Sequence, residues 1–207
     1  MNSISALQIH SKDYKFLKEA PFATITLFAD ENSLVGLDFI DMDISAIENT
    51  KHPILKEAKS QLLKYFQGRL KDFDLPLDLA GTDFQIKAWK TLIKIPFGQF
   101  ITYKEQSEKM KAGKAFRAVG SANGKNPIPI LIPCHRVVAS IGTVTESSKA
   151  LRAKSAKNKS AVGSTATRNP SKGLASKKSS ELLESRLGGY SGGIKIKKFL
   201  LQLEGAL

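Results

Sequence analysis

The residues whose side chains are best suited to take part in a reaction lie together in the run PIPILIPCHRVV, from Pro127 to Val138. Cys134 is the one cysteine of the sequence, and His135 and Arg136 follow it directly. A thiol is a strong nucleophile only as its thiolate; an imidazole can take its proton, and a guanidinium favours the anion. The prolines oppose a helix and predict a rigid extended or turn segment, in which His135 reaches the thiol through a turn or a bridging water. The run therefore favours a cysteine nucleophile.

The same residues limit other kinds of chemistry. A lone cysteine excludes an internal disulfide, and with only three histidines it leaves too few soft ligands for a zinc site, so no metal is expected. No glycine-rich phosphate loop follows a predicted strand, so no nucleotide cofactor is expected either. A purely structural role for Cys134 stays open at this point. A lone cysteine in an apolar stretch is more often a small buried residue than a nucleophile.

The 207-residue chain has a formal net charge of +13, unevenly distributed along the sequence. Residues 1–80 contain nine basic and twelve acidic side chains, whereas residues 81–140 contain ten and three. The basic part favours a polyanionic partner such as nucleic acid or an anionic membrane surface. No stretch approaches the roughly 18 apolar residues of a membrane span, and the N-terminus lacks the pattern of a signal peptide. We therefore expect a soluble intracellular protein.

The elements that must position these residues fall into two parts, separated by a predicted linker over Leu75–Gly81. In the first part, alternating apolar residues in Ala23–Leu27 and Val35–Phe39 flank the turn DENS and predict a hairpin with one buried face. Apolar residues at helical spacing from Leu55 to Phe66 predict a helix that Pro53 opens and that ends at Gly68. Residues 1–78 are thus predicted to form a small α/β domain.

The second part, residues 82–207, is predicted to be mainly helical. A capping-box pattern at Thr82 opens one helix, and a second at Thr102 opens another. A glycine-containing turn and a further helix follow, which together suggest a helix-turn-helix over about residues 103–125. Apolar residues at helical spacing predict a last helix near Ile194–Leu203.

The second helix of this motif has an unusually small surface between cations. Small side chains let a helix approach a backbone closely, and the cations beside them can hold phosphates. The alternative is a helix packed closely against a neighbour, with an ordinary solvated cationic rim. The small residues are Ala115, Ala118, Gly120, Ser121, Ala122 and Gly124, and the cations are Lys114, Arg117 and Lys125.

Several longer blocks occur in one fixed order: FGQFITY, FRAVGSANGKNP, NPIPILIPCHRVV and GGYSGGIKIKKFLLQLEG. In these blocks, over about residues 82–138 and 188–205, the chain resembles the O6-alkylguanine-DNA alkyltransferases, also called methylated-DNA–protein-cysteine methyltransferases. The resemblance implies a ribonuclease-H-like α/β domain followed by a winged-helix-like helix-turn-helix DNA-binding domain. It also implies direct DNA repair, in which a flipped O6-alkylguanine, or O4-alkylthymine, gives its alkyl group to the protein once and irreversibly.

The resemblance places the family's catalytic residues on this sequence. Cys134 corresponds to the alkyl acceptor. His135 corresponds to the residue that deprotonates the thiol through a water, and Glu204 to the carboxylate that orients this histidine. Asn126 corresponds to the asparagine that supports the same hydrogen-bond network.

The resemblance also implies residues that bind the substrate and the duplex. Tyr103 corresponds to the tyrosine that helps rotate the nucleotide and assists protonation of the leaving guanine, and Arg117 to the arginine that fills the vacated stack. Tyr190 and Ser191 correspond to the loop that walls the base pocket and donates to O6. The residues expected to contact DNA are Lys114, Ala115, Ala118, Ser121, Ala122, Lys125 and Arg136.

The chain departs from the family after Val138, where 49 residues stand in place of a short connection to Gly188. Residues 141–187 contain no aromatic side chain and are rich in Ser, Ala and Lys, so we expect a flexible basic insertion. Its ten basic and three acidic side chains are expected to add nonspecific affinity for DNA.

The expected partner is double-stranded DNA that contains O6-alkylguanine, bound by a monomer through the minor groove and without a membrane or a cofactor. The expected location is the cytoplasm, or the nucleus in a eukaryote. Two other functions remain open. One is a damage sensor of the same architecture that performs no chemistry, and the other is a basic helix-turn-helix protein with an architectural or regulatory role.

Overall fold

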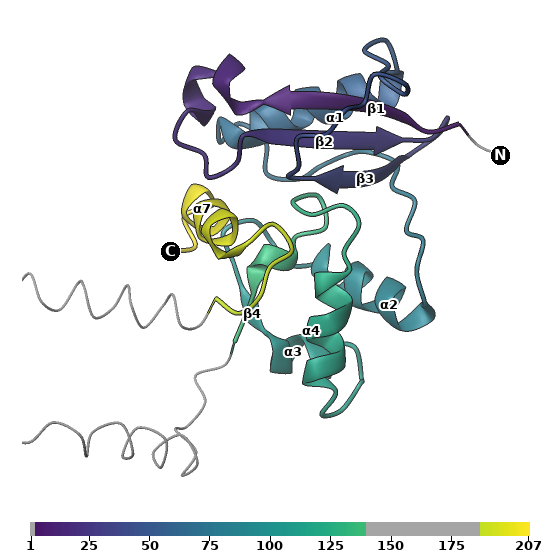
Figure 1. The fold of residues 1–207 in the computed structure, drawn as a ribbon. Helices are drawn as coiled ribbons and strands as arrows, with labels where there is room; N and C mark the ends of the chain where they lie inside the picture. Colours follow the sequence, from purple (N-terminus) through teal and green to yellow (C-terminus); the bar gives the residue numbers. More distant parts are fainter. Residues whose placement is uncertain (1–2, 140–186) are drawn as a thin grey trace, which may run out of the picture.

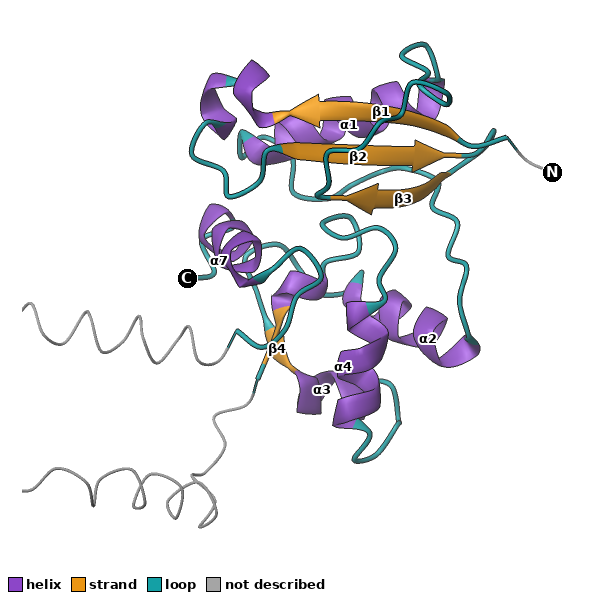
Figure 2. Ribbon diagram, viewed as in Figure 1, coloured by secondary structure: helices purple, strands orange, loops and turns teal. Residues whose placement is uncertain are grey.

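The computed structural model describes residues 3–139 and 187–207. The N-terminal half is a three-stranded antiparallel sheet in the order β1-β2-β3, with one long helix, α1, across its far face in Figure 1. Helices α2, α3, α4 and α7 gather below the edge strand β3 (Figures 1 and 2). The predicted fold class, a small α/β part followed by a mainly helical part, is confirmed.

The predicted hairpin is present as β2 (Thr24–Ala29) and β3 (Leu34–Asp38). A further strand that the sequence analysis does not predict, β1 (Ser5–His10), pairs with β2 and makes it the central strand. The expectation of one buried face is wrong for β2, because Thr24 and Thr26 are buried as well as its apolar residues. On the face of β2 that was expected to be exposed, the buried Thr26 hydroxyl donates a hydrogen bond to the Ile40 carbonyl at 2.6 Å.

Helix α1 (Pro53–Phe66) begins with the proline and buries the predicted stripe. In the second half, α2 (Asp83–Leu92) and α3 (Tyr103–Lys109) both begin at complete capping boxes. A turn with a left-handed Gly113 then leads into α4 (Phe116–Gly124), which confirms the predicted helix-turn-helix.

A short parallel pair of strands joins the helix-turn-helix to the rest of the second half. Strand β4 (Ile101–Thr102) precedes α3, and β5 (Val137–Val138) pairs with it. A single 3-10 turn over Cys134–Arg136 leads into β5, and helix α7 (Ile194–Leu203) closes the chain. The run of prolines thus gives a turn, one of the two conformations expected for it.

The two halves share one hydrophobic core. The edge of β3 is hydrogen-bonded to the second half, because the Leu37 amide donates to the Pro127 carbonyl at 2.9 Å. Three aromatic rings, from Phe22, Phe66 and Phe199, pack with their centroids 5.6 to 6.4 Å apart and join the sheet, α1 and α7. This junction brings α1 against α7, and Tyr65 of α1 is hydrogen-bonded to Glu204 at the end of α7.

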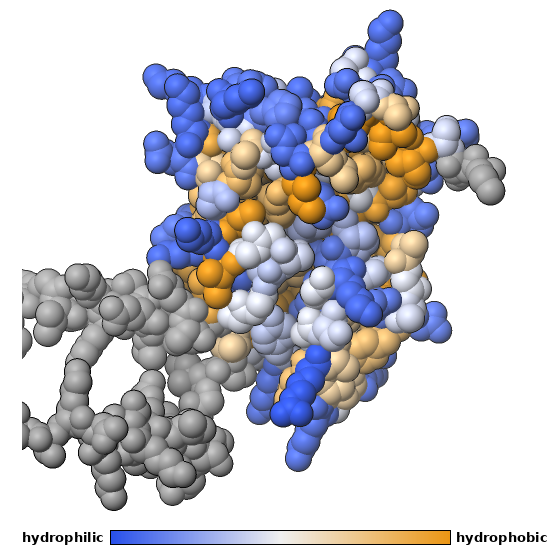
Figure 3. Space-filling model, in the orientation of Figure 1, coloured by the Kyte–Doolittle hydropathy of each residue, from blue (hydrophilic) through white to orange (hydrophobic). Residues whose placement is uncertain are grey.

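The surface of the protein is consistent with two halves that share one core. In Figure 3, strongly hydrophilic side chains line the outer margins of both halves, and apolar ones reach the surface mainly over the sheet and near the junction. No helix in the described part of the chain is long and apolar enough to cross a bilayer.

Candidate active site

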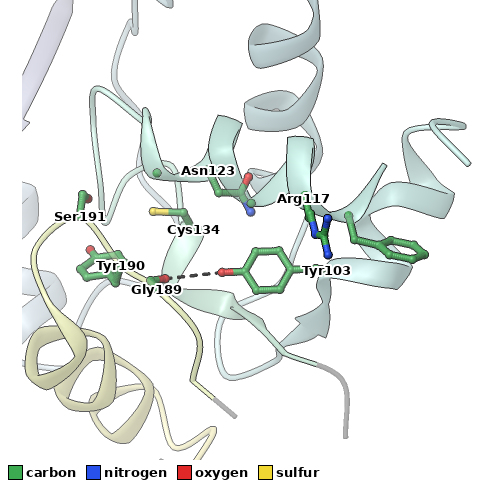
Figure 4. A pocket seen from close by; sticks show the side chains of 10 residues that line it. Tyr103, Arg117, Asn123, Cys134, Gly189, Tyr190 and Ser191 are labelled. Atoms are coloured by element: carbon green, nitrogen blue, oxygen red, sulfur yellow. Dashed lines mark hydrogen bonds between the residues drawn. The ribbon is translucent and has the colours of Figure 1, made fainter. Parts of the chain in front are cut away.

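A cavity of about 520 Å³ opens between α4, the start of α3, the turn with Cys134 and the loop before α7. In Figure 4, Cys134, Tyr190 and Ser191 gather at one end of it, Tyr103 lies in the middle, and Arg117 stands at the other end. The proposed acceptor and the four residues expected to bind the substrate therefore meet here. The lining residues are Tyr103, Phe116, Arg117, Gly120, Asn123, Gly124, Cys134, Gly189, Tyr190 and Ser191.

Asn126 holds the thiol in place. Its amide Nδ2 donates to the Sγ of Cys134 at 3.1 Å and to the Ile132 carbonyl at 2.7 Å, and its Oδ1 accepts from the Ile128 amide. The Cys134 amide itself donates to the Ile132 carbonyl at 2.8 Å. This ring of bonds fixes the turn from which the sulfur reaches the cavity, as the predicted supporting role of Asn126 requires.

The thiol is protonated at rest. Cys134 is 4% exposed, and burial raises its pKa from 9.0 to about 11, although the Asn126 hydrogen bond and the charge of Lys197 oppose the rise. At neutral pH a nucleophilic thiolate therefore forms only if a base removes the proton during the reaction.

His135 has the properties of that base. Its ring is fully buried, and Nε2 lies 2.9 Å from Oε1 of Glu204. Burial lowers its pKa below 6.5, against the opposing effect of Glu204, so the ring is neutral at pH 7. Because a carboxylate only accepts, Nε2 carries the proton, and Nδ1 is then a free acceptor. Within the described residues, this Nδ1 is buried without a hydrogen-bond partner.

Glu204, at the C-terminal cap of α7, accepts hydrogen bonds from three residues in addition to His135. Arg136 donates from Nε to Oε2 and from Nη2 to Oε1, both at 2.9 Å, and the Gly98 amide donates to Oε2 at 3.3 Å. The Tyr65 hydroxyl donates to Oε1 at 2.7 Å. Burial alone would raise the pKa of Glu204, but the hydrogen bonds and charges of His135 and Arg136 lower it to about 2. The carboxylate is therefore anionic throughout the neutral range.

This arrangement corrects the expectation for Arg136. From its sequence motif Arg136 is expected to contact DNA, but the residue is 5% exposed. Its guanidinium is bound to Glu204 and to the Ile95 carbonyl, at 2.6 Å, so it is not available to a phosphate. The 3-10 turn points the side chain inward, which the residue order alone does not reveal.

The loop before α7 forms the wall opposite α4. The Tyr103 hydroxyl donates to the Gly189 carbonyl at 3.5 Å, drawn as the dashed line in Figure 4. Gly188 has a φ of +65°, and a Cβ on it would lie 3.2 Å from the Tyr103 ring, so glycine allows this close approach. The Tyr190 hydroxyl is buried without a partner among the described residues, while Ser191 is exposed.

Helix α4 and the residues at its two ends include most of the residues expected to contact DNA. Lys114, Arg117, Ala118, Ser121 and Lys125 are exposed, and Ala115 is half-buried. A second correction concerns Ala122, whose side chain is 3% exposed and packs in the apolar cluster of Ala88, Met110 and Val119. Its carbonyl accepts from the Trp89 indole at 2.9 Å, so Ala122 faces the interior of the helical half.

Two functional candidates are absent from the sequence analysis. Lys197 is completely buried; its ammonium donates to the Val137 carbonyl at 2.5 Å and lies 5.9 Å from the Tyr103 ring centroid. Burial lowers its pKa to about 8, and the negative charge of Cys134 in its thiolate form opposes that shift. The other is Tyr65, through its bond to Glu204. Each of these two residues lies on the apolar stripe of its helix. The one sequence feature that could have identified Lys197 is the presence of a cation on a helix face that is otherwise apolar.

The assembled groups can perform nucleophilic transfer from a flat ligand. A buried thiol, a neutral imidazole with a free nitrogen and a carboxylate that stabilises the imidazolium form a chain from the cavity to Glu204. In the described residues, no group of three His, Cys, Asp or Glu side chains is placed to hold a metal ion. The cations at the rim of α4 suit an anionic partner that brings the ligand.

Two family models match this chain. One is described as 6-O-methylguanine DNA methyltransferase, ribonuclease-like domain, and matches residues 14–79. The other is described as 6-O-methylguanine DNA methyltransferase, DNA binding domain, and matches residues 83–161.

The similar proteins cover between 64% and 97% of this chain. A methylated-DNA–protein-cysteine methyltransferase of Methanosarcina barkeri is 44% identical over 197 residues, which are 92% of this chain and 96% of the relative. A constitutive protein of the same name from Bacillus subtilis is 38% identical over 141 residues, 64% of this chain and 85% of the relative. The crystal structure of Mycobacterium tuberculosis OGT in complex with DNA has a TM-score of 0.65 at 30% identity and covers 97% of this chain and 92% of its own.

Proposed function

Because the chain belongs to the 6-O-methylguanine DNA methyltransferase family and repairs DNA by transferring an alkyl group to a cysteine, we propose that Cys134 is the acceptor and O6-alkylguanine the substrate. The observation that carries the assignment is the position of the thiol. Cys134 is the one cysteine of the sequence, and it lines the cavity beside a neutral, buried His135. O4-alkylthymine, which carries its alkyl group on a comparable exocyclic oxygen, is proposed as a second substrate.

The proposed reaction is a displacement at the alkyl carbon. The thiol proton passes through a bridging water to Nδ1 of His135, and the imidazolium is stabilised by Glu204 at 2.9 Å. The sulfur forms a bond to the alkyl carbon as the bond from that carbon to O6 breaks. The electron pair remains on the guanine, which takes up a proton and leaves as the normal base. Asn126 holds the sulfur in position during these steps.

The leaving guanine needs stabilisation on the side away from the sulfur. Tyr103, Tyr190 and Ser191 line the cavity around the space that a base would fill. The Tyr103 hydroxyl bonds only weakly to the Gly189 carbonyl, at 3.5 Å, so it can turn to the ring of a bound base. We assign Tyr103 to assisting protonation of the guanine by donating a hydrogen bond to its ring, with the proton itself taken up from solvent, to which His135 later releases the thiol proton. We assign the loop with Tyr190 and Ser191 to recognition of O6.

The substrate must leave the duplex to reach the thiol. Unstacking a base costs a few kcal/mol, and a damaged pair costs less. Arg117 stands exposed at the mouth of the cavity, where it can fill the vacated place in the stack. We propose that the exposed small face of α4, Ala118 and Ser121, enters the minor groove while Lys114 and Lys125 bind phosphates.

The product is a thioether, which has no good leaving group. With no second thiol in the sequence to regenerate Cys134, each molecule is proposed to act once. It acts as a monomer without a cofactor, inside the cell, with residues 1–78 and 82–207 as its two domains. The basic insertion expected over residues 141–187 lies outside the described residues except for Leu187.

The mass of the intact protein tests this assignment. After incubation with duplex DNA that contains O6-methylguanine, the protein should gain one methyl group, and Cys134→Ser should gain none. Binding of the same DNA without a change in mass would instead identify a sensor, and equal binding of undamaged DNA would identify an architectural protein.

A further inference from the structure

Tyr65 connects the N-terminal half to the catalytic carboxylate. It lies in α1, 139 positions before Glu204, and its side chain is completely buried. Its hydroxyl donates to Oε1 of Glu204 at 2.7 Å, the same oxygen that holds Nε2 of His135. The resemblance and the cavity lining assign no role to this residue.

The Tyr65 ring has little freedom to move the hydroxyl. It packs edge-on to Phe97 with centroids 6.0 Å apart, and against Phe73 at 5.3 Å and Phe66 at 5.4 Å. Burial, and then the charge of Glu204, raise its pKa well above 10, so the hydroxyl keeps its proton and remains a donor at every working pH. A rigid ring with a permanent donor is suited to hold one carboxylate oxygen in one place.

We propose that Tyr65 is a positioning residue for the alkyl transfer, which fixes Oε1 of Glu204 so that His135 is held with Nδ1 directed to the thiol. This inference rests on the proposed function, because it assigns Tyr65 to the chain of groups that deprotonates Cys134. It also gives the N-terminal half a part in the chemistry, beyond its part in the core.

The expected effect follows from counting the donors on Oε1. Three groups donate to it: the Tyr65 hydroxyl, Nε2 of His135 and Nη2 of Arg136. When the hydroxyl is removed, the carboxylate becomes freer to turn and more basic. It then holds the imidazolium proton more strongly, which raises the pKa of His135.

The other charged and titratable groups around this pair are unchanged by the substitution. Arg136 faces Glu204 and His135 from the 3-10 turn, Lys197 faces His135 from α7, and Cys134 and Tyr190 face the cavity side. A shift in the pH profile on removal of the Tyr65 hydroxyl therefore reports on the bond to Oε1.

Tyr65→Phe is the direct test, with Tyr14→Phe as the matched control. Tyr14 also belongs to the N-terminal half and packs on the same core, and among the described residues its hydroxyl has no hydrogen-bond partner. Single-turnover transfer from a free O6-alkylguanine base and from alkylated duplex DNA gives two readouts. The amplitude counts the active molecules, and the rate constant reports the chemistry of those molecules.

Tyr65→Phe should lower the rate constant by about tenfold on both substrates, the size expected for the loss of a hydrogen bond to a charged group. The acid limb of its pH profile should move to higher pH, while DNA affinity and the Tyr14→Phe profile stay as in the wild type. In a Glu204→Ala background, which lacks the acceptor of the Tyr65 hydroxyl, the same substitution should have no further effect.

A lower amplitude with a wild-type rate constant and pH profile would overturn the inference and leave Tyr65 as a core residue only. That result would leave the proposed function intact. Failure of the proposed function has a different signature, because the wild-type protein itself would then gain no alkyl group.

Discussion

At the scale of single residues, the site consists of a thiol and an imidazole whose ionisation is set by burial. The pKa of Cys134 rises to about 11 and that of His135 falls below 6.5, so both groups are neutral at pH 7. The pair is therefore poised for proton transfer and is not a preformed thiolate–imidazolium ion pair. This state suits a protein that must spare its single thiol until a substrate arrives.

The pH dependence of transfer from a free O6-alkylguanine base tests this protonation state. The rate should be constant around neutral pH and fall in acid, as His135 takes up a proton below pH 6.5 and loses its free acceptor. In His135→Gln the thiol must ionise without a base. Its rate should be lower and should climb with pH toward the thiol pKa of about 11. A wild-type rate that also climbs steadily from pH 7 would contradict the role of His135.

Lys197 gives a second prediction at this scale. Its buried ammonium opposes the effect of burial on the Cys134 pKa, so Lys197→Met should raise that pKa further and slow alkyl transfer several-fold. Lys195→Met, on the exposed side of the same helix, is the matched control. Thermal unfolding separates this effect from a loss of stability. Equal transfer rates in the two variants would show that the ammonium has no catalytic effect.

At the scale of elements, the sequence predicted the features that are set by neighbouring residues. It did not predict the features that depend on partners far away in the chain. The capping boxes at Thr82 and Thr102 fix helix starts through bonds within four residues, so the sequence shows them. Strand β1 and the two-residue strands β4 and β5 form only because partners lie beside them. Likewise the inward direction of Arg136 depends on Glu204, 68 residues away in the chain.

The same distinction holds for the candidate site. The cavity gathers Cys134, Tyr103 and Arg117, all of which were predicted from motifs in the sequence. Tyr65 and Lys197 remained hidden, because on an apolar stripe a tyrosine or the stem of a lysine looks like ordinary packing. Their functional atoms are defined only by what the other half of the fold places next to them.

Arg117 on α4 provides a prediction for the DNA-reading element. Arg117→Ala should slow transfer from duplex DNA, because nothing then fills the vacated stack, but should leave transfer from the free base unchanged. Lys64→Ala, on the exposed side of α1, removes a cation from the other half and serves as the control. An equal loss on both substrates would mean that Arg117 acts in the chemistry and not in extrusion.

At the scale of the whole molecule, the basic charge is shared between the second half and the insertion. Residues 141–187 contribute ten basic and three acidic side chains, as many as residues 81–140. Val138 and Leu187 pack in one cluster with Leu201, so a short linker can replace the residues between them. The fold can therefore be tested with and without this charge.

Replacing residues 141–186 with a short Gly-Ser linker should flatten the dependence of DNA affinity on salt, because fewer counterions are released on binding. Transfer from a free O6-alkylguanine base should stay at the wild-type rate. Titrations of undamaged DNA at several salt concentrations measure the slope. A slope equal to that of the full chain would reject a DNA-binding role for the insertion.

We propose that one alkyl group moves from O6 of guanine to Cys134 and stays there. The most direct measurement is the yield of restored guanine per protein molecule, with O6-methylguanine duplex in large excess and the methylated peptide mapped afterwards. We expect repair to stop at one guanine per molecule, with the methyl group on Cys134. Continued turnover, or a methyl group on any other residue, would contradict it.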